Sequence, residues 1–143
     1  MKKVIIPVAV LSTMAALLLV AIGCNVSTAS LSNVRVCEQI DGEQCPSDMS
    51  TIGKESPSFY VSADIDSAPT GTKIKIDWRY LSGEIGNEPQ DIDSVSLTTE
   101  EGSNNLQSSL QRSAEIWPRG EYEVVLKIET DNAEPVHKPF SVK

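Results

Sequence analysis

The feature that most constrains the fold of this chain is a strict alternation of apolar and polar side chains within short segments. Residues 73–80 show it most clearly: the apolar residues on one face are Ile74, Ile76, Trp78 and Tyr80, and the polar residues on the other are Lys73, Lys75, Asp77 and Arg79. Successive side chains of a strand point to opposite faces, so this pattern predicts a β-strand with one buried and one solvated side. The same period recurs in residues 59–65 and 121–129.

Three weaker segments extend the pattern. Residues 91–99 form a strand in which Ile92 is out of phase and marks a bulge. Residues 106–112 read as an edge strand, and residues 136–142 as a last strand that Pro139 confines to an edge or a bulge. No helical period of ten or more residues follows the N-terminal segment, so we expect an all-β chain: a small antiparallel sandwich of six to seven strands.

The N-terminus has the form of an export signal. Lys2 and Lys3 precede an uncharged apolar stretch that ends in Gly23-Cys24. This ending resembles the lipobox of bacterial lipoproteins, which implies that residues 1–23 are a signal peptide, that Cys24 carries the lipid (palmitate among its acyl chains), and that the protein is anchored in the cell envelope. Asn25 after the cysteine favours the outer membrane if the cell is Gram-negative.

Two other interpretations of this segment stay open. Ser27-Thr28-Ala29 has the small-x-small form of an ordinary signal peptidase site, and cleavage there would remove Cys24. Alternatively, residues 4–23 are long enough to remain as an uncleaved membrane-spanning helix. Beyond the signal, small polar residues predict a flexible tether over 24–34. We expect a disulfide loop region over 35–56 and the folded domain over 57–143.

Cys37 and Cys45 flank a turn signal, Asp41-Gly42, with seven residues between them. In an exported protein this even pair predicts a disulfide. The alternative is a metal site, but the only histidine, His137, is far away in the sequence.

Residues 117–124, Trp-Pro-Arg-Gly-Glu-Tyr-Glu-Val, resemble the W-P-x-G-x-Y turn before the penultimate strand of small immunoglobulin-like domains in bacterial lipoproteins. Trp78 and Tyr122 would form the core pair of such a domain. The resemblance covers about residues 57–143 and implies an Ig-like β-sandwich. That family has no single activity, so it implies no particular function.

Charge and motifs narrow the function classes. The formal net charge is −8, and loss of Lys2 and Lys3 with the signal changes it to −10. Such an acidic chain repels nucleic acid, so we expect no nucleic-acid partner. The chain has no Gly-x-Ser-x-Gly and no phosphate-binding glycine loop, and we expect it to be no enzyme and to need no cofactor.

Few residues are candidates for a binding site. Trp117 is either a lid that closes one end of the sandwich or an exposed contact, with Arg119 beside it. Metal ligation has only weak calcium candidates, and solvated turns are their other interpretation: Asp64, Asp66, Asp91 and Asp93. We therefore expect a membrane-tethered domain that binds another envelope protein. The alternative is a small-ligand or carbohydrate-binding module that uses the loops around Trp117.

Overall fold

The computed structural model describes residues 27–143, so the predicted signal peptide and Cys24 lie outside the described residues. This part of the chain forms eight strands: β1 (Ser30–Cys37), β2 (Thr51–Ile52), β3 (Ser58–Asp66), β4 (Lys73–Gly83), β5 (Gln90–Thr98), β6 (Asn105–Gln111), β7 (Gly120–Ile128) and β8 (Val136–Val142). The all-β prediction is confirmed. Within residues 27–143 no helix has the length and hydropathy needed to cross a membrane.

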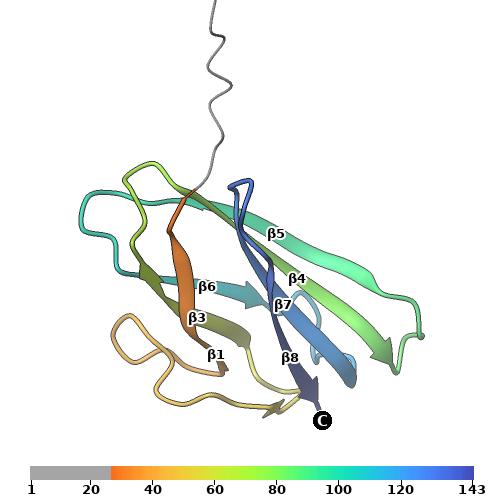
Figure 1. Cartoon of the computed structure of the whole chain (residues 1–143). Coiled ribbons are helices and arrows are strands. Elements are labelled where there is room, and N and C mark those ends of the chain that lie inside the picture. The colour runs from red at the N-terminus through yellow and green to blue at the C-terminus, as the bar shows by residue number, and fades with distance from the viewer. Residues whose placement is uncertain (1–26) are drawn as a thin grey trace, which may run out of the picture.

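The strands form two sheets that pack against each other (Figure 1). One has three strands in the order β1-β3-β6, and the other has five in the order β2-β8-β7-β4-β5. All neighbours are antiparallel except β2 and β8, which run parallel over two residues. The expected antiparallel arrangement of six to seven strands is thus corrected to eight strands with one parallel pair.

The core lies between the sheets and is built from the alternating residues. Its buried members include Phe59, Val61, Ile74, Ile76, Trp78, Val124, Leu126 and Phe140. Phe140 stacks on Tyr122 at a centroid distance of 5.6 Å and meets Phe59 edge to face at 5.1 Å. The period of two therefore identified the inner faces of β3, β4, β7 and β8 correctly.

The predicted tether ends earlier than expected. Residues 30–34 belong to β1, which pairs with β3 along most of its length, so the assignment of 24–34 as tether is wrong for these residues. The register shifts between Ser32 and Arg35, and Asn33 has a φ of 51°. This irregularity places Leu31 and Val36 on the same face although five positions separate them, which hides the strand from a search for period two.

The region predicted as a disulfide loop does contain the bond. Cys37 and Cys45 are linked, with 5.7 Å between their Cα atoms, so the alternative of a metal site for them is wrong. The loop lies over the outer face of β3, where Cys45 N donates to Ser62 Oγ at 2.9 Å and Gln44 Nε2 to Asp64 Oδ1 at 2.5 Å. Residues 35–56 are thus a packed part of the domain.

The edge features follow the sequence. Trp78 pairs with Asp93 and Arg79 with Asp91, which leaves Ile92 as the extra residue of a bulge in β5. β6 is an edge strand, as predicted. Pro139 pairs with Glu123 of β7, and β2 reaches only Ser141 and Val142 of β8, so the missing N–H of Pro139 lies on an unpaired edge.

Candidate functional site

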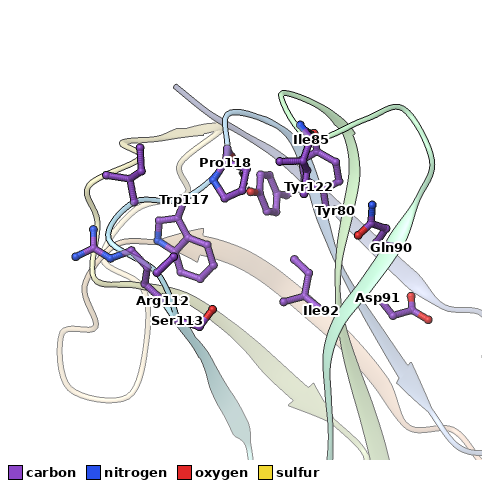
Figure 2. Close-up of a pocket in the computed structure, with 12 residues that line it drawn as sticks. Tyr80, Ile85, Gln90, Asp91, Ile92, Arg112, Ser113, Trp117, Pro118 and Tyr122 are labelled. Carbon is purple, nitrogen blue, oxygen red and sulfur yellow. Dashed lines mark hydrogen bonds between the residues drawn. The ribbon is translucent and has the colours of Figure 1, made fainter.

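The candidate site is a pocket of about 300 Å³ at one end of the two sheets. The turn between β4 and β5, the first residues of β5, and the connection from β6 to β7 surround it (Figure 2). Tyr80, Trp117, Pro118 and Tyr122 form its inner wall. Tyr80, Trp117 and Tyr122 belong to the buried core, so the pocket borders directly on it.

Three exposed isoleucines line the pocket, together with the polar side chains of Gln90, Asp91, Arg112 and Ser113. Ile85, Ile92 and Ile116 are 54%, 41% and 42% exposed, and they are the exposed large hydrophobic residues of residues 27–143. All three line this pocket, although 31 positions separate the first from the last. Exposed apolar side chains that gather at one hollow are typical of a binding surface, whereas scattered ones need no explanation.

Trp117 closes this end of the core, as one of the two sequence interpretations expected. Its ring stacks on Phe59 with centroids 4.1 Å apart, its Nε1 donates to Ser56 O at 2.7 Å, and only 5% of the residue is exposed. The interpretation of Trp117 as an exposed contact is wrong, because Phe59 shields one face of its ring. Arg119 is exposed and does not line the pocket.

Two tyrosines fix the inner wall. Tyr122 donates its hydroxyl to Pro118 O at 2.7 Å, and Tyr80 accepts from Ile85 N at 3.1 Å. Burial, followed by the electrostatic influence of Tyr80 and Glu84, raises the pKa of Tyr122 to about 12. The phenol therefore stays neutral at physiological pH and holds the β6–β7 connection in place.

Close backbone contact between Gly83 and Gly120 shapes the floor behind these rings. The two residues pair across β4 and β7, with φ values of 142° and 154°. A Cβ on Gly120 would lie 2.2 Å from Ser82 O, and one on Gly83 would lie 2.4 Å from Arg119 O. Glycine at both positions is what allows the β4–β5 turn to reach the β6–β7 connection.

Charged groups beside the pocket are already paired. Arg79 Nε donates to Asp91 at 3.0 Å and Arg79 Nη1 donates to Glu123 at 2.9 Å. The hydrogen bond that Arg79 donates to Asp91 is the largest cause of the raised pKa of Arg79. His137 Nδ1 lies 3.1 Å from the other oxygen of Glu123. This network lies on the outer face of the five-stranded sheet and meets the pocket at Asp91, which is one of the lining residues.

The calcium candidates do not come together. Asp64 accepts from Gln44 and Asn33, and Asp66 accepts from Ser32 Oγ at 2.7 Å. Asp91 is paired with Arg79, and Asp93 accepts from Ser94 N at 2.9 Å. Residues 27–143 contain no group of three His, Cys, Asp or Glu side chains that could hold a metal ion. The carboxylates of the four candidate aspartates instead accept hydrogen bonds from neighbouring donors of the protein.

Sequence reasoning found Trp117 but missed the three isoleucines around it. Ile85 and Ile116 lie in polar connections that carry no strand period, and the sequence pattern predicts Ile92 only as the extra residue of a bulge. The one available signal was an isoleucine in an otherwise polar turn. What the assembled pocket offers chemically is apolar contact area in a fixed shape, which suits binding.

No family model and no curated protein matches the chain. Among solved structures, a β-glucosidase from Erythrobacter marinus is similar with a TM-score of 0.46 and 10% identity, covering 82% of this chain and 16% of its own. An alkylpurine DNA glycosylase from Pseudomonas fluorescens, bound to DNA with an abasic site analog, has a TM-score of 0.46 and 14% identity. The match covers 82% of this chain and 31% of the glycosylase. A superoxide reductase from Ignicoccus hospitalis has a TM-score of 0.43 and 13% identity, and the match covers 66% of this chain and 75% of the reductase. Likenesses this weak say nothing about the activity of the chain.

Proposed function

We propose that this protein is a non-catalytic, membrane-tethered lipoprotein of the cell envelope, and that its Ig-like domain binds another envelope protein through the pocket rimmed by Ile85, Ile92 and Ile116. The observation that carries the proposal is the gathering of these exposed isoleucines at one hollow. The Ig-like assignment rests on the W-P-x-G-x-Y segment and agrees with two packed β-sheets.

The position of the pocket supports this role. Ser27, the first described residue, is held at the opposite end of the domain, where Asn132 of the β7–β8 hairpin donates to Ser27 O at 2.7 Å and accepts from Ser27 N at 3.0 Å. The described part of the chain begins at that end (Figure 1). A lipid on Cys24 would therefore leave the pocket facing away from the membrane, toward a partner.

The test is crosslinking in intact cells that express the full chain, followed by capture and mass spectrometry. We expect one dominant partner, and an acylated Cys24 as the N-terminus of the captured chain. Ile85→Ser and Ile116→Ser should abolish the capture without unfolding the domain, because both side chains are about half exposed in the folded state.

The matched control is Thr70→Ser, an exposed position in the connection between β3 and β4 near the tethered end. It should leave the capture unchanged. Equal capture by the two isoleucine variants would contradict the binding role of the pocket. A chain that begins at Ser30 would contradict the lipid anchor alone.

A second candidate function is the binding of a small apolar ligand. The volume of about 300 Å³ supports it, since this is the lower end of the usual size of ligand sites. A carbohydrate platform receives no such support, because the Trp117 ring is shielded. A purified domain that melts at a higher temperature with small apolar compounds, and loses this shift with Ile92→Ser, would favour the small-ligand function.

A further inference from the structure

We propose that the partner contributes an extended segment that pairs with the open edge of β6 and covers the inner face of β5. The inference rests on the proposed function that the domain binds a protein, and it specifies how that protein is held. Three observations support it: the unprotected edge of β6, the incompletely covered inner face of β5, and the negative charge of Asp93 on that face.

The edge of β6 lacks the features that usually prevent strands from adding. It runs for seven residues in unbroken register with β3, and it contains neither a charged residue nor proline. The other edges of the described sheets are protected. β1 and β5 carry irregularities in register, and β2 has only two residues. Val36 N of β1 is also occupied by Asp48 Oδ1 at 3.0 Å.

The register shows which backbone groups of β6 are available. Ile65 N donates to Asn104 O at 2.9 Å, and Arg112 N donates to Pro57 O at 3.0 Å. Bonded and non-bonded pairs alternate in an antiparallel ladder, so the bonds to β3 fall on Leu106, Ser108 and Leu110. The N–H and C=O groups that point to the open edge therefore belong to Gln107, Ser109 and Gln111.

A strand added there would lie over β5. The two sheets differ by two strands, and β1 lies against β8. From the strand orders we infer that β3 faces β7 and β6 faces β4, so that β5 has no strand opposite it. Val95 and Leu97 of β5 are accordingly half-buried, while their neighbours on β4, Ile76 and Ile74, are completely buried. A fourth strand, one spacing of about 4.8 Å beyond β6, would cover Val95 and Leu97.

Charge indicates the chemistry of the segment. Asp93 is exposed and lies on the same face of β5 as Val95 and Leu97, because it pairs with the inward-facing Trp78. The whole chain has a formal charge of −8. We therefore infer a partner segment with apolar residues at alternate positions and a basic residue opposite Asp93. A second copy of this chain is disfavoured, since its β6 carries no basic residue and its net charge is equally negative.

The probe is the blocked peptide Thr-Lys-Thr-Val-Thr-Val-Thr. Antiparallel to β6, it would place its lysine at Asp93 and its valines at Val95 and Leu97. With the full chain in detergent, amide hydrogen exchange should show new protection at Gln107, Ser109 and Gln111. Leu106, Ser108 and Leu110, which are bonded to β3, should change little. A peptide N-methylated at its third and fifth residues should bind at least about tenfold more weakly, because it loses two backbone hydrogen bonds.

Two variants separate the edge from the charge. Ser109→Pro removes an N–H that β3 does not use, so the fold should persist while peptide binding is lost. Asp93→Lys should reverse the preference, so that a peptide with glutamate in place of lysine binds better. The proposal would be overturned if Ser109→Pro bound the peptide as tightly as the wild-type protein does. It would also be overturned if the lysine and glutamate peptides bound equally well to the wild-type protein and to Asp93→Lys.

Absence of new protection on β6 at saturating peptide would also overturn the proposal. Protection that rises with protein concentration alone, together with a dimer in sedimentation, would assign the edge to a second copy and likewise overturn it. None of these results touches the proposed function, which fails only if the isoleucine variants of the pocket retain capture of the partner.

Discussion

At the scale of single residues, Tyr122 joins the core to the candidate site through one hydroxyl group. Its ring packs against Phe140 and Tyr80, and its hydroxyl donates to Pro118 O. Because burial raises its pKa from the ordinary value of 10.0 to about 12, the folded state holds the proton more tightly than the unfolded chain. The resulting stabilisation is complete below pH 10 and is lost as the pH rises toward 12.

We therefore expect Tyr122→Phe to flatten the fall of the free energy of unfolding between pH 10 and 12. At neutral pH the substitution should lower the free energy of unfolding by about 1 kcal/mol, since one hydrogen bond is lost. Urea unfolding at a series of pH values measures both effects. Tyr60→Phe, on the outer face of β3, is the control. An alkaline slope that survives in Tyr122→Phe would show that another group controls it.

Gly120 is a residue at which the fold tolerates no side chain. A Cβ there would clash with the backbone at Ser82 O, and its φ of 154° disfavours any other residue. Gly120→Ala should lower the free energy of unfolding by about 3 kcal/mol, combining clash and backbone strain. Gly86→Ala isolates the strain, because its φ is 135° but no atom lies within 4 Å of the added Cβ. Equal losses in the two variants, from thermal melts, would argue against the close contact.

At the scale of elements, the disulfide loop covers the outer face of the three-stranded sheet. Cys45 N donates to Ser62 Oγ, and Arg35 Nη1 donates to Cys45 O at 3.1 Å. Closing a loop of this length should contribute about 2–3 kcal/mol, as estimated from the entropy of the unfolded chain. The double change Cys37→Ala with Cys45→Ala should lose this amount in urea unfolding.

The same double variant should also raise the exchange of the Cys45 amide, while the amides of β7 keep their native-state protection. Reduction of the wild-type protein provides the control, because it opens the bond without changing the side chains. A full loss of folding in either form would mean that the loop nucleates the sheet and does more than restrain the unfolded chain.

The sequence predicted the strands that keep several alternating residues in phase and missed β1 and β2. β4 and β7 alternate without interruption along their buried halves, so their inner faces were predicted residue by residue. β1 was missed because the irregularity at Asn33 reverses its phase, and β2 because two residues carry no period. The pocket was not predictable, since Ile85, Ile92 and Ile116 meet only through the packing of three separate segments.

At the scale of the whole molecule, the two ends of the domain have different surroundings. The chain arrives at Ser27 beside the β7–β8 hairpin, and nine residues of β7 separate this end from Gly120 near the pocket. At about 3.3 Å per residue the two ends lie about 30 Å apart. A lipid at Cys24, as proposed, would keep the hairpin end near the bilayer and hold the pocket beyond the reach of lipid headgroups.

This separation can be measured with fluorophores on single added cysteines. Lipidation of Cys24 and the bond between Cys37 and Cys45 would leave no other thiol to label. In vesicles with a headgroup quencher, a dye on Thr70→Cys should be quenched strongly and a dye on Glu88→Cys, in the β4–β5 turn, should not. Removal of the first 24 residues should abolish both vesicle binding and quenching. Equal quenching at the two positions would mean that the domain lies flat on the membrane. Lipid would then compete with the partner for the pocket and the β6 edge.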